Sequence, residues 1–243
     1  MKIVAFNGSP RGESGNTYLM TEEFLAGARE AGAETEHILL AQKKIGHCLG
    51  CLACWLKTPG KCVIADDMAD LLKKFVSADI VVFATPVYVD NVTGLMKNFM
   101  DRLVPLADPR FAKTPEGECR HIIREGESPD IVVISNCGFP EQSHFQVLKL
   151  LFSRIARNMN AQVVAEIYRG GGEMLKGKNI LLIPLIMRYK KLLRTAGKEV
   201  VEGRKVSAET AAALEKPLVA DEMYIKYANE YFEKVLKEIA EKS

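Results

Sequence analysis

Five short segments rich in apolar and β-branched residues recur through the first 167 residues, with an amphipathic segment between each pair. The segments that we expect to be strands are residues 2–7, 34–40, 79–84, 130–135 and 161–167. Those with apolar residues at helical spacing are residues 17–31, 66–77, 91–103 and 143–160. Runs such as DIVVFA and DIVVIS are typical of strands covered on both faces. The pattern therefore predicts an α/β fold of βαβ units around a parallel sheet.

Two stretches depart from this alternation. Residues 105–129 carry prolines and charges, and we expect them to form a long excursion between helix and strand. From residue 170 the chain turns to glycines, an apolar patch and helices, the last of them at 221–241 with a Tyr/Phe stripe. We expect residues 1–169 to form the main domain. Residues 170–243 should form a helical extension packed on that domain or on a partner subunit.

Charge and hydropathy exclude several classes of function. Lys and Arg number 33 against 31 Asp and Glu, and a net charge of +2 is too small for a dedicated nucleic-acid surface. The longest strongly apolar run, residues 180–187, contains Pro184 and falls far short of the ~20 residues that span a bilayer. The first residues lack the features of a signal peptide. We therefore expect a cytoplasmic protein with no integral membrane segment.

The turn after the first expected strand, GSPRGESGNT at residues 8–17, is rich in hydrogen-bond donors. Its polar side chains are Ser9, Arg11, Ser14, Asn16 and Thr17. The helix that follows adds unpaired backbone amides and a positive dipole end, so the turn predicts a phosphate site. It matches neither the Walker pattern nor G-x-G-x-x-G. The alternative is a polar turn that only caps the helix.

Two further turns should lie at the same edge of the sheet, where open parallel sheets bind ligands. Residues 85–91 place Pro86-Val87-Tyr88 directly after the third strand, and residues 136–142 follow the fourth. A restrained backbone with an aromatic ring beside it can hold a flat heterocycle. The alternative for each turn is ordinary packing.

These three turns resemble those of the flavodoxin-like FMN-binding oxidoreductases, specifically the NADPH-dependent FMN reductase and iron–sulfur flavoprotein group. The resemblance covers about residues 1–167 and is carried by GSPRGESGNT (8–17), TPVYVDNVTGLMKNFMDR (85–102) and SNCG (135–138). It implies a doubly wound five-stranded parallel sheet of order 2-1-3-4-5. It also implies FMN, with Ser9, Arg11, Ser14, Asn16 and Thr17 on the phosphate. The residues implied at the flavin ring are Pro86, Val87, Tyr88, Asn91, Cys137 and Gly138.

The same resemblance implies an FMN-dependent oxidoreductase. Electrons would pass from NAD(P)H, or from a reduced ferredoxin, through the flavin to a quinone-like, nitro or protein acceptor. Flavin N5 carries the chemistry, so no catalytic side chain is assigned. The alternatives are a flavodoxin-type electron carrier or redox-responsive binding protein without substrate turnover, and a flavin-free structural protein. Because the family builds flavin sites near subunit contacts, a homodimer or homotetramer is expected.

Four of the six cysteines, Cys48, Cys51, Cys54 and Cys62, form the pattern C-x2-C-x2-C-x7-C. Without a secretory signal, such a cluster favours metal ligation or thiol redox chemistry over a disulfide framework. Thiolates suit Fe–S clusters or Zn²⁺, and the spacing resembles the [4Fe–4S] motif of iron–sulfur flavoproteins. The alternatives are Zn²⁺, which usually takes two well-separated Cys pairs, and thiols that are free, disulfide-bonded or structural.

Overall fold

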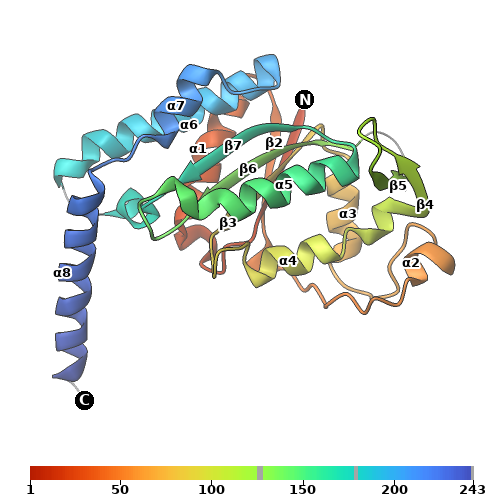
Figure 1. Ribbon diagram of the computed structural model, residues 1–243, viewed down its shortest axis with the longest axis horizontal. Helices are drawn as coiled ribbons and strands as arrows, with labels where there is room; N and C mark the ends of the chain where they lie inside the picture. The colour runs from red at the N-terminus through yellow and green to blue at the C-terminus, as the bar shows by residue number, and fades with distance from the viewer. Residues whose placement is uncertain (125–127, 178–179, 242–243) are drawn as a thin grey trace.

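Five parallel strands form the central sheet of the computed structural model, which describes residues 1–124, 128–177 and 180–241 (Figure 1). The strands are β1 (Lys2–Asn7), β2 (Glu34–Leu39), β3 (Ile80–Pro86), β6 (Asp130–Asn136) and β7 (Val163–Arg169). Their order is β2-β1-β3-β6-β7, and every neighbouring pair is parallel. Counted along the chain this is 2-1-3-4-5, so the predicted doubly wound topology is confirmed.

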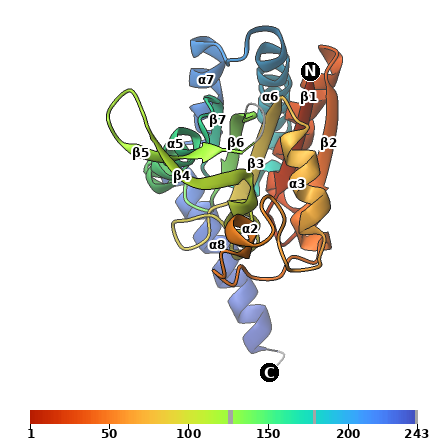
Figure 2. The same cartoon turned by 90° about the vertical axis from the view of Figure 1, so that its right-hand side faces the viewer.

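Helices cover both faces of the sheet (Figures 1 and 2). One face carries α3 (Met68–Val76), α4 (Gly94–Asp101) and α5 (Gln146–Met159). The other face carries α1 (Asn16–Glu30), α6 (Ile183–Gly203) and α7 (Ala208–Glu215). Because side chains alternate along a strand, Val4 and Phe6 pack toward the first layer, whereas Ile3 and Ala5 pack toward the second. The sheet is thus buried on both sides, as its apolar runs predicted.

The excursion at residues 105–129 contains a hairpin that the sequence pattern did not indicate. Within its described part, β4 (Ala107–Lys113) pairs antiparallel with β5 (Cys119–Ile123). The pairing shifts register between Asp108 and Phe111, on either side of Pro109. Most of its side chains are exposed or half-buried, so no clean alternation of apolar and polar residues marks it. Residues 125–127 of the excursion lie outside the described residues.

The first part of the C-terminal extension packs on the sheet. Helix α6 crosses α1 so closely that a Cβ on Gly197 would lie 2.0 Å from the carbonyl oxygen of Phe24. Helix α7 is held by the buried Arg169 of β7, which donates to the carbonyl oxygens of Leu214 and of Lys216, the latter at 2.8 Å. Residues 178–179 and 242–243 of the expected extension lie outside the described residues.

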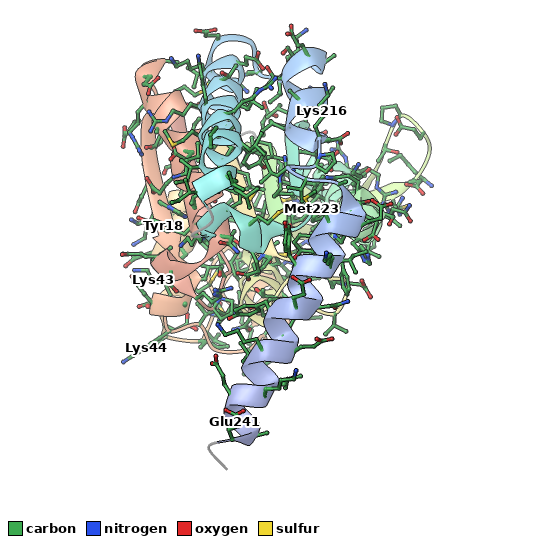
Figure 3. All side chains as sticks on the ribbon, turned by 90° about the vertical axis from the view of Figure 1, so that its left-hand side faces the viewer. Tyr18, Lys43, Lys44, Lys216, Met223 and Glu241 are labelled. Carbon is green, nitrogen blue, oxygen red and sulfur yellow. The ribbon has the colours of Figure 1, made fainter. Side chains whose placement is uncertain are left out.

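Helix α8 (Asp221–Ala240) projects from the body of the protein, and none of its residues is buried (Figures 1 and 3). Among the described residues, no helix is both long and apolar enough to cross a membrane.

Candidate functional site

A cleft opens at the carboxyl edge of the sheet, where the turns after β1, β3 and β6 meet. Its lining residues are Ser9, Arg11, Asn16, Thr17, Pro86, Val87, Tyr88, Asn136, Cys137, Gly138 and Glu173. All the side chains implied for FMN are among them except Ser14 and Asn91. Asn136 and Glu173 line the cleft although the sequence assigned them no role.

The turn at residues 8–17 is held from inside the fold. Asn7 Oδ1 accepts a 2.9 Å hydrogen bond from the amide of Ser9, which is buried. A Cβ on Gly15 would lie 2.7 Å from Ser9 Oγ, so the close approach of the backbone there requires glycine. Gly15 also precedes α1 and provides no side-chain cap. The first-turn amides are therefore left to a ligand or to water, as at other anion-binding helix ends.

The side chains of α1 join the first and third turns. Thr17 Oγ1 accepts a 2.8 Å hydrogen bond from Asn136 Nδ2. Asn16 is buried, and its amide oxygen has no hydrogen-bond partner within the described chain. This oxygen is an acceptor, so a ligand group that donates a hydrogen bond would complete it. The donors of the same turn, which are the hydroxyls, the Arg11 guanidinium and the first amides of α1, suit the phosphate of FMN.

Ser14 does not face the cleft. Its hydroxyl donates to the carbonyl oxygen of Arg11 at 2.7 Å, and its side chain is exposed. The structure therefore gives Ser14 a part in shaping the turn.

The second turn presents backbone and one ring to the cleft. Val87 donates its amide to the carbonyl oxygen of Asn136 at 2.8 Å, which fixes the turn against β6. Tyr88 and Asn91 exchange backbone hydrogen bonds of 2.9 and 3.1 Å across a tight turn. The side chain of Asn91 accepts from the amide of Val92 and does not line the cleft. Tyr88 remains about half exposed, which leaves its ring available to a ligand.

Cys137 supplies a neutral thiol to the third turn. Its sulfur donates to the carbonyl oxygen of Phe139 at 3.2 Å, and burial raises its pKa to about 11. At neutral pH this side chain is therefore neither an anion nor an effective nucleophile. The carbonyl of the neighbouring Gly138 accepts a 2.5 Å hydrogen bond from Tyr224 Oη, at the start of α8.

An ion pair crosses the mouth of the cleft. Arg11 Nη1 lies 2.6 Å from Glu173 Oε1, and both side chains are at least half exposed. Lys176 is close by, and burial followed by the charge of Arg11 lowers its pKa. An arriving phosphate would compete with Glu173 for Arg11. Glu173 could not be found from sequence, because it comes from the segment after β7, beyond the three predicted turns.

The four clustered cysteines do not form an assembled metal site. Cys48 and Cys51 are exposed, whereas Cys54 and Cys62 are partly buried, and all are free thiols. Within the part of the chain that the structure describes, no three Cys, His, Asp or Glu side chains are grouped closely enough to hold a metal ion. The thiols thus suit a cluster chemically, but their present arrangement does not fit one.

A buried arginine holds the cysteine segment at both ends. Arg102 is 1% exposed and pairs with both carboxylate oxygens of Asp66, at 2.7 and 3.1 Å. It also donates to the carbonyl oxygen of Gly46 at 2.6 Å and to Cys62 Sγ at 3.4 Å. Gly46 precedes the four cysteines and Asp66 follows them, so the Arg102 guanidinium holds the two ends of the cysteine segment together.

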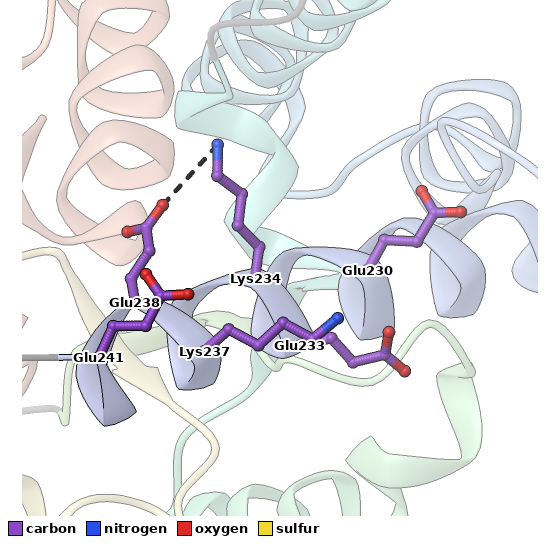
Figure 4. Close-up of a pocket in the computed structure, with 6 residues that line it drawn as sticks. All are labelled: Glu230, Glu233, Lys234, Lys237, Glu238 and Glu241. Carbon is purple, nitrogen blue, oxygen red and sulfur yellow. Dashed lines mark ion pairs between the residues drawn. The ribbon is translucent and has the colours of Figure 1, made fainter.

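A second hollow lies along α8 and is lined only by charged residues of that helix (Figure 4). Its residues are Glu230, Glu233, Lys234, Lys237, Glu238 and Glu241. Lys234 and Glu238 form an i,i+4 ion pair at 3.9 Å. The hollow is the polar face of a surface helix and offers no enclosure for a ligand.

Comparison with known proteins gives matches to both sequence and fold. Residues 1–116 match the sequence profile of the family described as NADPH-dependent FMN reductase. An iron-sulfur flavoprotein of Methanocaldococcus jannaschii is 45% identical over 106 residues, which are 44% of this chain and 53% of that protein. An iron-sulfur flavoprotein of Archaeoglobus fulgidus is 37% identical over 142 residues, 58% of each chain. The matches thus span a little over half the length of these two relatives.

Among solved structures, an FMN-dependent NADH-azoreductase of Bacillus anthracis in complex with FMN has a TM-score of 0.60 to this chain. The alignment covers 82% of this chain and 99% of the azoreductase at 18% identity, which shows a common fold. The first 116 residues of the chain are thus similar in sequence to the NADPH-dependent FMN reductase family.

Proposed function

We propose that this chain is an FMN-dependent oxidoreductase that takes electrons from NAD(P)H. One observation carries the proposal: three turns meet in a single cleft that is rich in hydrogen-bond donors at one end and bordered by Pro86, Val87 and Tyr88 at the other. The match of residues 1–116 to the NADPH-dependent FMN reductase family and the flavoprotein names of the relatives support the same cofactor.

The residues divide into two groups. Ser9, Asn16, Thr17 and the first amides of α1 would hold the phosphate, joined by Arg11 once it leaves Glu173. The backbone of the second and third turns would hold the ring, with Tyr88 beside it and the neutral Cys137 thiol adding no charge. When bound, FMN supplies the redox chemistry by accepting a hydride and passing electrons on.

Titration with FMN, followed by the quenching of flavin fluorescence, tests the binding step. We expect saturable binding, and Thr17→Val should weaken it about tenfold because a hydrogen bond to a charged group is lost. Thr21→Val is the matched control, since Thr21 lies one turn further along α1 and its hydroxyl bonds the carbonyl oxygen of Thr17. Failure of the wild-type protein to take up FMN would contradict the proposal.

Turnover distinguishes an enzyme from a carrier. The loaded protein should oxidise NAD(P)H steadily when a quinone, a nitro compound or a redox protein is present as acceptor. Saturable FMN binding combined with negligible NAD(P)H oxidation would instead favour a flavodoxin-type electron carrier.

A [4Fe–4S] cluster on Cys48, Cys51, Cys54 and Cys62 is a separate part of the proposal. It is supported by the spacing of these cysteines and by the names of the relatives, and it requires the segment to close around the cluster. Iron and acid-labile sulfide in anaerobically purified protein would be lost in Cys51→Ser and kept in Cys119→Ser. Iron-free wild-type protein with bound FMN would remove the cluster and leave the flavin proposal intact. We further propose a homodimer or homotetramer.

A further inference from the structure

A chain of hydrogen bonds leads from the surface of α1 to the turn at residues 8–17 without entering the cleft. Glu22 Oε1 lies 2.6 Å from His37 Nδ1, and His37 Nε2 lies 3.1 Å from Asn7 Nδ2. Asn7 Oδ1 in turn accepts from the amide of Ser9 at 2.9 Å. The chain therefore ends on a backbone group of the turn assigned to the phosphate.

The hydrogen bond from the Ser9 amide to Asn7 determines the direction of the other two. A backbone amide can only donate, so the atom of Asn7 that faces Ser9 is the oxygen. The Asn7 amide nitrogen then faces His37, and Nε2 must accept. The imidazole proton therefore sits on Nδ1, where it is donated to Glu22.

The surroundings of His37 hold its ring in place. Its side chain is 8% exposed, and its ring stacks on Tyr18 with centroids 4.8 Å apart. Glu22 remains available as an acceptor because its hydrogen bond with His37 lowers its pKa, although burial opposes this. Asn7 is fully buried, so the loss of either of its partners would leave a polar group unsatisfied.

We propose that His37, as its Nδ1-protonated tautomer, is a positioning residue for the phosphate turn: it orients Asn7, which holds the Ser9 amide in place. The inference rests on the proposed function, since it assigns the turn to the phosphate of FMN. An imidazole protonated on Nε2 would set two donors against each other and turn Asn7 away from Ser9.

Two substitutions separate this role from simple packing. Gln can place an acceptor oxygen near the position of Nε2, whereas the shorter Asn cannot reach Asn7. His37→Asn should weaken FMN binding by about three- to tenfold, because one net hydrogen bond to the turn is lost. His37→Gln should stay within about twofold of the wild type. The matched control is His121→Asn, which alters a ring that packs at an angle against Trp55 and Phe111, away from the cleft.

The experiment is FMN titration of these variants together with nitrogen-15 NMR of the flavin-free wild-type protein. The NMR spectrum should show His37 protonated at Nδ1 and unprotonated at Nε2. Glu22→Ala removes the acceptor for the Nδ1 proton from a half-buried position on α1. It should therefore allow the Nε2-protonated tautomer of His37 and weaken FMN binding. This variant tests the inference even if the His37 variants do not fold. Equal affinities of His37→Asn and His37→Gln, or a proton on Nε2 in the wild type, would overturn the inference. Wild-type protein that shows the expected tautomer but binds no FMN would overturn the proposed function instead.

Discussion

At the scale of single residues, Arg102 carries the largest stability prediction. Its guanidinium lies fully inside the fold, between the carboxylate of Asp66 and the start and end of the cysteine segment. Arg102→Met would leave Asp66 buried without its partner. We expect the free energy of unfolding, measured with urea, to fall by about 3 kcal/mol, the usual cost of breaking a buried pair. A loss below about 1 kcal/mol would mean that the pair is screened like a surface salt bridge.

The same pair predicts a dependence on pH. Burial raises the pKa of Asp66, but the hydrogen bonds from Arg102 and from the amides of Gly46 and Met68 outweigh it and hold the pKa below 3.8. A lowered pKa contributes stability that is complete above the unfolded value and is lost as pH falls through the folded one. The stability difference between wild type and Arg102→Met should therefore shrink below pH 3.8. A constant difference between pH 7 and pH 3 would contradict this account.

Cys137 should react more slowly than the exposed cysteines of the protein. Because burial raises its pKa to about 11, its thiolate fraction at pH 8 is far below that of an ordinary cysteine. In metal-free protein, iodoacetamide should modify the exposed Cys48, Cys51 and Cys119 first. Mass spectrometry of peptides after timed labelling measures the order. Early modification of Cys137 at pH 8 would show that its thiol is more accessible and more acidic than its surroundings imply.

Glu173 should oppose flavin binding. Its carboxylate occupies Arg11 at the mouth of the cleft, and exposed pairs of this kind contribute about 0.2–1 kcal/mol. Glu173→Gln should therefore raise the affinity for FMN by up to about fivefold. Glu13→Gln is the control, because it removes a charge from the turn at residues 8–17, which also holds Arg11, without altering the lining of the cleft. It should change the affinity for FMN less. Equal gains in both variants would indicate a general charge effect rather than competition for Arg11.

At the scale of elements, the crossing of α1 and α6 depends on two glycines. A Cβ on Gly27 would lie 1.9 Å from the carbonyl oxygen of Arg194, and one on Gly197 would lie 2.0 Å from that of Phe24. Gly197→Ala should therefore destabilise the fold by about 1–3 kcal/mol, despite the better helix propensity of alanine. Gly203→Ala is the control on the same helix, because its Cβ would meet nothing within 4 Å. Urea unfolding should show little loss, or a gain, in the control.

The elements also show how far the sequence determined the fold. Strands β1, β3 and β6 could be predicted because each is almost wholly buried and reads as an apolar run. The hairpin of β4 and β5 could not, since its partly exposed strands lack a period of two. Helix α4 was predicted to begin at residue 91 and begins at Gly94, because Thr93 caps it. Thr93 Oγ1 also donates to the carbonyl oxygen of Gly8, so the cap ties α4 to the turn at residues 8–17.

In the cleft, too, some residues could be predicted from the sequence and others could not. Side chains within the turns after β1, β3 and β6 could be predicted because the carboxyl ends of parallel strands meet at one edge. Ser14 and Asn91 lie in those turns, yet their side chains bond to nearby backbone, which sequence does not reveal. Glu173 depends on how the chain folds back after β7, a long-range feature with no local signal.

At the scale of the whole molecule, α8 stands out because none of its residues is buried. Its apolar side chains Tyr227, Tyr231, Phe232 and Leu236 are each more than half exposed, and its charged face lies along the hollow of Figure 4. Its first turn contacts the body, where Tyr224 donates a hydrogen bond to the carbonyl oxygen of Gly138. An amphipathic helix gains most of its stability by packing its apolar face. We therefore expect this face to meet a second copy of the chain, as in the proposed homodimer or homotetramer.

Sedimentation of the protein tests this arrangement. The wild type should sediment as a dimer or tetramer, and Phe232→Glu should shift it to a smaller species by placing a charge within the apolar contact. Lys237→Gln, on the charged face of the same helix, should leave the assembly unchanged. Because Tyr224 of α8 bonds to the third turn of the cleft, dissociation should also loosen that end of the site and weaken FMN binding modestly. A wild-type monomer, or a Phe232→Glu variant that assembles like the wild type, would show that the apolar face of α8 is covered in another way.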